Sequence, residues 1–444
     1  MDDEEKIICH NCIEDEYVSE LIKITGEENT TCSYCNKTTS TIAIGSVADM
    51  MHKVFNDYYS SHHEIEHYSF GSTAEEIICE ELGTDEEASS DIFSFLYDKH
   101  NEYDYEVYSE FYVYVRDAYE ITEFDFTWKK IKTSLETESR YFNDNLRGFF
   151  DDIFSGVEQV FNSSGATIKT LGPGDVFFRA RVFNDYDEIK AELEHPERNF
   201  GPPPSAKARA GRMNAPGVPV FYGATSKETA IAEVRPAVGS TVVVCQFRPV
   251  HPMRILDLSA LEDIVIKEGS LFNPETRKQI DITSFLKTLS RKLTIPVSAA
   301  RSDSEYLITQ AVSEYLSISA PLELDGIMFH STQSEHPTEK RDGKYNVVLF
   351  RKSSRVRNGA ADGIKYKVSL YENAEDDFYE PRASIVPMDE YKLNKIPESA
   401  LYRLFKKADL QMDTSSIEVH TVKSVLYVTD AQPVDLKNAS MNDK

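Results

Sequence analysis

The sequence predicts an α+β protein in which a paired-cysteine module and a helical bundle precede a mixed α/β domain. Two Cys-x-x-Cys pairs stand within the first 35 residues. Residues 46–63 and 91–121 are rich in Phe and Tyr and contain no Pro or Gly, which is typical of packed helices. From about residue 170, short apolar runs separated by Gly- and Pro-containing turns indicate strands that alternate with helices.

Length and composition place the chain among folded proteins. It has 444 residues, which suits two or three domains, and 41% of them are hydrophobic, enough for a real core. No run of 18 uncharged apolar residues occurs, so the sequence predicts no transmembrane helix. The N-terminus, MDDEEK, is acidic where a secretory or mitochondrial leader would be basic, so we expect a cytoplasmic protein.

The net charge of −27 is concentrated at the front of the chain. Residues 1–150 hold 34 Asp and Glu against 11 Lys and Arg, a net charge of −23, and the remainder carries about −4. Because phosphate contacts need Lys and Arg, this distribution argues against nucleic acid as a partner of the front half. A solvated acidic surface explains the charge better than a dedicated partner site does.

Four of the six cysteines form two pairs, Cys9 with Cys12 and Cys32 with Cys35. Each Cys-x-x-Cys turn directs two thiolates at one point, and two such turns together make a tetrahedral zinc site. We therefore predict a zinc-knuckle module over residues 1–45, with a structural metal because protein would fill all four positions. Two disulfides or a redox pair are the alternatives, which a reducing cytosol and the lack of a strand–helix context disfavour.

Residues 46–165 are predicted to be mainly helical. Within them, the segment from His63 to His67 reads HEIEH and matches H-E-x-x-H, which on a helix would hold a protease metal between two imidazoles. The charged Glu66 at an inner position and the polar flanks favour a solvated helix surface instead. A metalloprotease is therefore only a remote alternative.

In the α/β region, residues 170–355, several side chains suit an anionic ligand that contains a ring. Arg179 lies on a predicted strand, and Arg212 lies with Asn214 in a Gly-flanked loop, where arginine forks and backbone amides bind phosphate oxygens. Tyr222, on a short strand, offers a ring that stacks on a heterocyclic base. The plain alternative is that the arginines are surface residues of strands and loops.

Two further candidates in this region are Glu233 and Ser331. Glu233 is a carboxylate in an otherwise apolar helix, where it is unfavourable unless it is paired or functional. Ser331 follows a predicted strand at the point where polar groups emerge from a sheet. The alternatives are an ion pair between Glu233 and Arg235 or Lys227, and a turn capped by Ser331.

Read in order, segments across residues 170–352 resemble the RES family, which is named for its Arg, Glu and Ser. FFRARVF resembles the opening arginine strand, and AGRMNAPGVPVFYGATSKETAIAEV resembles the signature G-R-W-N-x-x-G-x-P-x-x-Y-x-A-x-S-x-x-x-A-x-x-E. EYLITQAVSEYL, LDGIMFHST and NVVLF resemble the later helix and strands. Met213, in place of an aromatic residue, and His330, in place of Pro, depart from the family pattern.

The resemblance implies a domain similar to the catalytic domain of ADP-ribosyltransferases. It implies an enzyme that cleaves the nicotinamide–ribose bond of NAD, a glycohydrolase or phosphorylase acting as a bacterial toxin or defence effector under an antitoxin or regulatory protein. A protein-modifying ADP-ribosyltransferase and a non-catalytic nucleotide-binding module are the alternatives, and the oligomeric state is open. The implied catalytic residues are Arg179, Glu233 and Ser331, with Arg212, Tyr222 and Asn214 as ligand contacts.

The sequence signals in the front half and in the C-terminal tail are less specific than those of the α/β region. Four cysteines and helical texture resemble the zinc-knuckle and HEPN-like segment that precedes some RES domains, so residues 46–165 are predicted to be HEPN-like. The R-x4–6-H motif of a HEPN ribonuclease is absent, because no His falls between His100 and His195 and the first arginine is Arg116. In the C-terminal extension, residues 356–444, we expect two strands and a helix, with KSVLYV extending the catalytic sheet or forming an added module.

Overall fold

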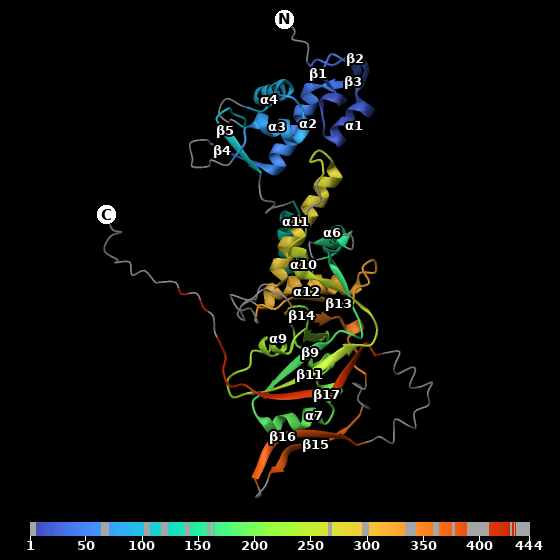
Figure 1. Ribbon diagram of the computed structural model, residues 1–444, viewed down its shortest axis with the longest axis vertical. Coiled ribbons are helices and arrows are strands. Elements are labelled where there is room, and N and C mark those ends of the chain that lie inside the picture. Colours follow the sequence, from blue (N-terminus) through green and yellow to red (C-terminus); the bar gives the residue numbers. More distant parts are fainter. Residues whose placement is uncertain are drawn as a thin grey trace, which may run out of the picture. The chain divides into compact units, whose positions relative to one another are not determined.

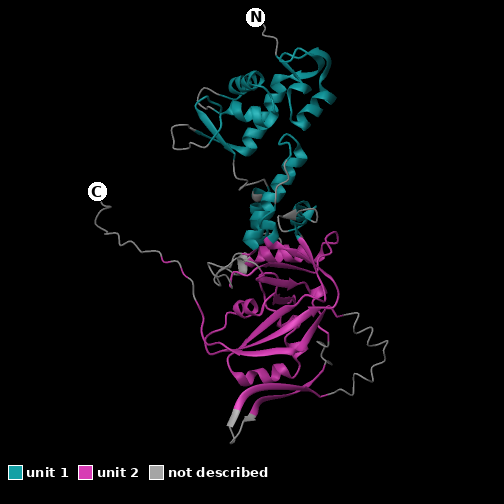
Figure 2. Cartoon of the chain, in the orientation of Figure 1, with its two compact units in different colours: residues 1–167, 260–293 teal, residues 168–259, 294–444 magenta. Residues whose placement is uncertain are grey.

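The structure is a computed structural model that describes residues 6–63, 71–101, 107–116, 123–137, 143–157, 161–162, 165–264, 269–294, 302–333, 343–357, 364–374, 378–388, 408–426, 429 and 431. The chain forms two compact units, residues 1–167 with 260–293, and residues 168–259 with 294–444 (Figures 1 and 2). Both units contain helices and strands, so the predicted α+β class is confirmed. Residues 260–293 fall inside the predicted catalytic span but group with the N-terminal unit.

The first unit begins with a three-stranded sheet and continues with helices. Its elements are β1 (Ile7–Cys9), the 3-10 helix η1 (His10–Cys12), α1 (Glu16–Thr25), β2 (Glu27–Thr31), β3 (Thr38–Ala43), α2 (Ile44–Tyr58), β4 (Tyr59–His63), α3 (Ala74–Leu82), α4 (Glu86–His100), β5 (Tyr112–Arg116), α5 (Glu123–Thr137), α6 (Asp144–Phe154), β6 (Phe161–Asn162) and β7 (Gly165–Ala166). The inserted segment 260–293 has α10 (Leu258–Glu262) and α11 (Pro274–Thr294) at its two ends.

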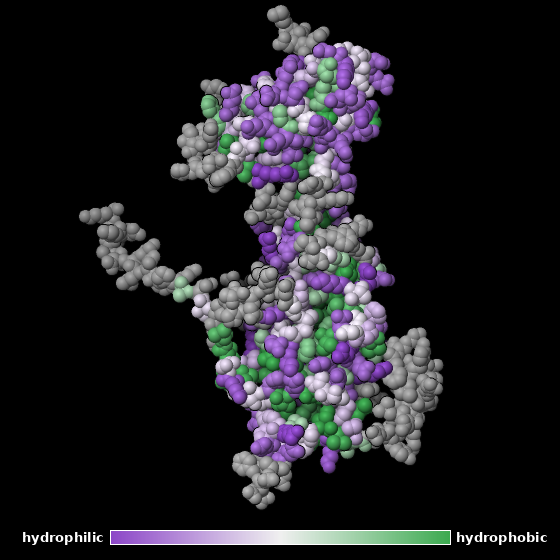
Figure 3. Space-filling view, viewed as in Figure 1, coloured by the Kyte–Doolittle hydropathy of each residue, from purple (hydrophilic) through white to green (hydrophobic). Residues whose placement is uncertain are grey.

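Apolar residues at helical spacing form the core of this unit. On α2, Val47, Met51 and Val54 are fully buried, at intervals of four and three residues, and they pack in one cluster with residues of α3 and α4. Thr73 and Glu76 form a capping box at the start of α3, which fixes where that helix begins. On the face drawn in Figure 3, hydrophilic residues cover most of this unit, as expected for a solvated acidic surface.

Two predicted helical segments contain strands. The helix expected over residues 46–63 ends at Tyr58 and continues as β4, which pairs antiparallel with β5. The sequence of β5, YVYVR, alternates aromatic and β-branched residues, so strand pairing overrides the helical texture there. His63 is the last residue of β4 and is not on a helix, while the rest of the H-E-x-x-H segment lies outside the described residues.

The second unit is built on one eight-stranded sheet. Its elements are β8 (Ile168–Leu171), β9 (Phe177–Phe183), η3 (Tyr186–Glu188), α7 (Ile189–Leu193), α8 (Pro196–Asn199), η4 (Ser205–Lys207), β10 (Phe221–Ala224), α9 (Lys227–Glu233), β11 (Thr241–Pro249), β12 (Met253–Asp257), α12 (Ser302–Ile318), β13 (Gly326–His330), β14 (Tyr345–Leu349), η6 (Arg351–Ser353), β15 (Tyr366–Ala374), β16 (Phe378–Pro387) and β17 (Leu410–Thr421). The strand order is β17-β11-β9-β10-β14-β13-β12-β8, antiparallel except for the parallel pair β12 and β13.

Both faces of the central strands are covered. Along β11, Val243 and Cys245 pack in a cluster with α7 and β15, whereas Val242 and Val244 pack with Ala230 of α9. The helices α9 and α7 accordingly lie on opposite faces of the sheet (Figure 1). A strand buried on both faces needs a continuous apolar run, and TVVVCQF is such a run. The sheet therefore holds β9 and β10, which carry the candidate site residues, in a rigid layer.

The C-terminal extension joins the main sheet. β17 pairs antiparallel with β11 along most of its length and forms one edge of the sheet. The strand ends at Thr421, so IEVHT extends the sheet, whereas residues 422–426, which include the described part of KSVLYV, carry no strand. The predicted strand near residue 366 is present as β15, and the predicted helix before Ala408 lies outside the described residues. Among the described helices, none combines the length and apolar character that a membrane span needs.

Candidate functional site

A cavity of about 430 Å³ opens beside the centre of the eight-stranded sheet. Its wall comes from β9, β10 and β14, from the end of α9, and from the loop that precedes β10. The sequence-predicted Arg179, Arg212, Tyr222 and Glu233 all line it. Ser331 lies directly behind Glu233. The volume falls within the range of small-molecule binding sites.

The Glu233 carboxylate is held from behind by two donors. The Ser331 hydroxyl donates to Glu233 Oε1 at 2.6 Å, and Asn346 Nδ2 donates to the same oxygen at 2.7 Å. Ser331 is 1% exposed and Asn346 is 7% exposed, so both donors are fixed by the fold. Glu233 itself, the last residue of α9, is exposed toward the cavity, and Oε2 accepts no hydrogen bond from the described residues. That oxygen is available to a ligand.

Arg179 brings a positive charge to the floor of the cavity. Its Nη1 donates to the Tyr222 carbonyl oxygen at 2.9 Å, and its guanidinium lies 5.2 Å from the centroid of the Phe221 ring. Burial, together with nearby Arg181, lowers the pKa of Arg179 to about 9, so the side chain stays charged at neutral pH. Within the described residues Arg179 forms no ion pair, whereas Arg181 pairs with Glu192 at 3.4 Å. A half-buried cation that has no carboxylate partner among the described residues favours an anionic ligand.

The loop before β10 is locked onto Tyr222. The Tyr222 hydroxyl donates to Asn214 Oδ1 at 3.0 Å and accepts the Met213 N–H at 3.0 Å. Gly211 passes so close that a Cβ there would lie 2.6 Å from Asn214 Oδ1 and 2.9 Å from the Tyr222 hydroxyl. The hydroxyl is therefore committed to the loop, and only the ring of Tyr222 is left to face a ligand.

A polar face of α12 supports the same loop from outside. Thr309 donates to the Arg212 carbonyl oxygen, and Gln310 Nε2 donates to that of Gly211 at 2.8 Å. Ser313 donates to the carbonyl oxygen of Met213 at 2.8 Å. Three side chains of one helix thus donate to three successive carbonyl oxygens, and that of Gly211 also accepts the Asn214 N–H at 3.4 Å.

Sequence reasoning missed several of these residues. Asn346 is a polar residue inside the apolar strand YNVVL, and such a residue signals a buried hydrogen bond. Thr309 and Ser313, four residues apart, mark a polar stripe on α12. Arg235 lines the cavity with φ 47°, a left-handed conformation that is strained for a residue with a side chain and that clusters at functional sites.

Not every predicted position faces the cavity. Asn214 holds Tyr222 and does not line the cavity, so its predicted role as a direct ligand contact would need a change in the loop. Met213 is buried and also lies outside the cavity lining. His330 stacks on Tyr345 with 4.4 Å between ring centroids, on the side of β13 opposite to Phe329, which lines the cavity. Neither of the two departures from the family pattern therefore lines this cavity.

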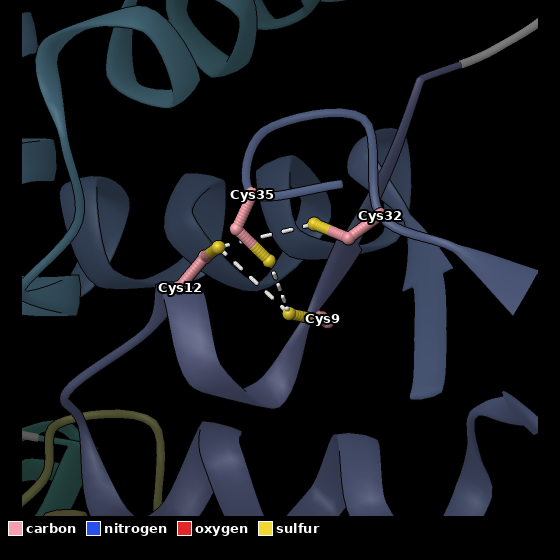
Figure 4. A group of neighbouring side chains, drawn as sticks. All are labelled: Cys9, Cys12, Cys32 and Cys35. Atoms are coloured by element: carbon pink, nitrogen blue, oxygen red, sulfur yellow. Dashed lines mark hydrogen bonds between the residues drawn. The ribbon is translucent and has the colours of Figure 1, made fainter. Parts of the chain in front are cut away.

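A second candidate site lies in the first unit, where the four predicted cysteines converge (Figure 4). Cys9 Sγ lies 3.8 Å from Cys12 Sγ and 3.5 Å from Cys35 Sγ, and Cys12 Sγ lies 3.8 Å from Cys32 Sγ. Four sulfurs at Zn–S distances of about 2.3 Å in a tetrahedron stand about 3.8 Å apart, which matches this set. A disulfide would need about 2.05 Å between sulfurs, and the four cysteines are free. This cluster can hold a metal.

Backbone amides favour a thiolate in this cluster. Burial raises the pKa of the Cys32 thiol, but the backbone N–H groups of Cys35, Tyr34 and Cys9 outweigh it and lower the pKa to about 7. Asn36, with φ 55°, takes the left-handed turn that lets the chain fold back after Cys35. The backbone of the second knuckle, residues 32–35, thereby orients its sulfur atoms toward the cluster.

The fold and the main site define a mixed α/β domain whose cavity contains an arginine, a glutamate and the serine behind it. Residues 178–367 match the family model described as the RES domain, so this chain contains a RES domain. The match includes Arg179, Arg212, Tyr222, Glu233 and Ser331. No curated protein and no solved structure matches the chain. The family match does not include the first 177 residues, so the HEPN-like resemblance stays a prediction.

Proposed function

We propose that the RES domain degrades NAD by cleaving the bond between nicotinamide and ribose, as a glycohydrolase or a phosphorylase. One observation carries the proposal: within the described residues, the cavity joins a charged arginine without an acidic partner to a carboxylate that has one oxygen without a hydrogen bond. An anionic dinucleotide that becomes cationic at its ribose during the reaction needs both charges. The presence of a RES domain supports an NAD-related activity of this kind.

The geometry suggests a role for each side chain. Arg179 and Arg212 would bind the pyrophosphate oxygens, for which planar guanidinium groups are well shaped. The Tyr222 ring would stack on the nicotinamide or on the face of its ribose. Glu233 would accept hydrogen bonds from the ribose hydroxyls through Oε2 and stabilise the oxocarbenium-like transition state as nicotinamide leaves.

Ser331 and Asn346 would act on Glu233 and not on the substrate. Both donate to Oε1, so they fix the rotation of the carboxylate and leave Oε2 directed at the cavity. Such preorganisation means that the carboxylate needs no reorientation when positive charge develops. The acceptor of the ribosyl group would be water in a glycohydrolase or inorganic phosphate in a phosphorylase. A toxin or defence role, held in check by an antitoxin or other regulator, would follow from the loss of NAD.

Turnover of NAD by the purified full-length protein tests this function. The expected result is release of nicotinamide, abolished by Glu233→Gln and unaffected by Glu228→Gln, an exposed glutamate on the same helix that does not line the cavity. Dependence on added phosphate, with ADP-ribose phosphate as product, would identify a phosphorylase. Transfer of ADP-ribose to protein in place of free product would identify the transferase alternative. Binding of NAD without any turnover would contradict the enzyme and favour a nucleotide-binding module.

We further propose that the four cysteines hold a structural zinc ion. All four positions are filled by sulfur, which leaves no place for a substrate and is typical of a structural site. The ion would join η1 to the turn after β2 and so hold the small sheet of the first unit together. Metal analysis of the purified protein tests this, with one zinc per chain expected and none in a variant with Cys9→Ser and Cys32→Ser.

A further inference from the structure

A second cavity, larger than the first, lies in the same unit. Its volume is about 650 Å³, and its wall comes from residues 213–220, the second half of α12 and the segment that follows β14. Neither Arg179 nor Glu233 lines it, so it has no part in the proposed reaction. Its volume is within the range of small-molecule sites.

The inner surface of this cavity is apolar. Met213, Val220 and Phe350 line it, and they are 2%, 5% and 2% exposed. At its mouth stand two apolar side chains that are much more open, Val218 at 39% and Ile318 at 73% exposed. Exposed apolar residues around an apolar cavity are typical of a ligand-binding site and uncommon elsewhere on a protein surface.

The rim on the side of residues 351–355 is cationic. Arg351 and Lys352 are exposed, and within the described residues their side chains make no ion pair or hydrogen bond. Arg355 pairs with Asp409 at 3.0 Å and is neutralised. Among the described lining residues Glu314, on α12, is the single carboxylate. Two uncommitted cations beside an apolar hollow, in a chain of net charge −27, select an anion that carries an apolar body.

The two cavities share a wall. Met213 and Asn214 line the second cavity, while Arg212 and Tyr222 line the first. The Tyr222 hydroxyl bonds to both Asn214 and the Met213 N–H, so the residues that face one cavity hold a residue that faces the other. A ligand that pushes on Met213 therefore acts on the placement of Arg212 and Tyr222.

We propose that this second cavity binds a small amphipathic anion of the fatty-carboxylate class, with its chain against Met213 and Phe350 and its head group at Arg351 and Lys352. Occupancy would change the affinity of the first cavity through the segment 211–214. Only this second statement rests on the proposed NAD-degrading function. The binding statement stands apart from it.

Calorimetry on the full-length protein tests the binding, with dodecanoate below its micelle concentration as the probe. We expect saturable binding of one dodecanoate per chain and no such binding of dodecyltrimethylammonium, which has the same chain and the opposite charge. The double variant Arg351→Gln and Lys352→Gln removes two charge-assisted contacts, so the dissociation constant should rise at least about tenfold. The matched control is Lys190→Gln with Lys367→Gln, two exposed lysines of the same unit that line neither cavity, and it should bind as the wild type does.

A second variant fills the second cavity and leaves Arg351 and Lys352 unchanged. Ser317 lies at the cavity wall on the outer surface of α12, and Ser317→Trp would fill the mouth and abolish dodecanoate binding with little effect on folding. The KM for NAD should change at least about twofold in the presence of dodecanoate in the wild type and not in Ser317→Trp, as coupling through a shared wall requires. If the protein consumes no NAD, calorimetry still decides the binding statement, so the two failures are distinguishable.

Four outcomes would overturn the inference. Two of them are dodecanoate binding without saturation and dodecanoate binding with equal affinity to the double glutamine variant. Competitive displacement of dodecanoate by NAD would make the second cavity part of the dinucleotide site. Concentration-dependent dimerisation that Ile318→Asp abolishes would show instead that a second copy of the chain covers the cavity.

Discussion

The cysteine cluster and the cavity of the RES domain are assembled from the chain in opposite ways. All four sulfurs come from residues 9–35: each Cys-x-x-Cys pair stands in one tight turn, and the small sheet β1-β3-β2 brings the two turns together. The cavity draws Arg179 from β9, Glu233 from α9 and Asn346 from β14, which only the strand order of the sheet makes neighbours. The first site depends on local geometry, and the second depends on long-range pairing. Loss of the cysteine cluster should affect the folding of its module. Substitutions in the cavity should affect ligand binding and catalysis.

The largest effect is expected from removal of the metal. Structural zinc in small modules contributes roughly 10–16 kcal/mol of binding free energy that is also folding free energy. A strong chelator should therefore unfold the cysteine module, seen as a lost thermal transition and as protease cleavage within residues 1–45. Release of thiols at unchanged thermal stability would contradict a structural role for the metal.

Next in size is the effect of replacing Arg179. Arg179→Gln should lower kcat/KM for NAD by about 10²-fold, because one charge-assisted contact to phosphate inside the cavity is lost. Its matched control is Arg181→Gln, on the same strand but paired with Glu192 and absent from the cavity lining. Steady-state kinetics of both variants, with thermal melts to confirm folding, separates the two. Equal losses in both variants would indicate a general effect of charge.

A smaller effect should follow from the support of Glu233. Asn346→Ala removes one of two donors to Oε1, so kcat should fall by about tenfold while KM changes little. Ser331→Ala should behave alike, and the double variant should lose less than the product of the two, because both act on one carboxylate. An unchanged kcat in Asn346→Ala would show that Asn346 does not support Glu233 during catalysis.

The smallest effect is expected at the loop. Tyr222→Phe removes the hydroxyl that joins Asn214 to the Met213 N–H and keeps the ring, so the KM for NAD should rise a few-fold, about 1 kcal/mol. Gly211→Ala, whose Cβ would meet the same hydroxyl, should raise KM in the same direction. Steady-state kinetics checks both variants, and a lower kcat with unchanged KM would argue that the loop does not position the ligand.

How much the sequence predicts differs between the two regions for the same physical reason. The Cys-x-x-Cys spacing predicts a site because its geometry is local. Arg179, Glu233 and Ser331 are recognised through family resemblance, since nothing in their spacing says that β9, α9 and β13 meet. The role of Asn346 is not predicted from the sequence, because its partner Glu233 lies 113 positions away in the chain.

Local composition also predicts the wrong secondary structure where pairing with a distant strand determines it. YVYVR looks like part of a long aromatic helix, yet it pairs as β5 with the residues that follow α2. KSVLYV has the composition of a strand, yet its described residues 423–426 carry none, and the edge strand β17 that pairs with β11 consists of residues 410–421. In both cases the neighbouring strand, and not the propensity of the segment, sets the outcome.

The most direct test of the central claim is a crystal structure of the Glu233→Gln variant with NAD bound. We expect the pyrophosphate oxygens within hydrogen-bond distance of Arg179 and Arg212, the nicotinamide beside the Tyr222 ring and a ribose hydroxyl at the side chain of residue 233. A dinucleotide bound elsewhere, or with its pyrophosphate away from both arginines, would contradict it.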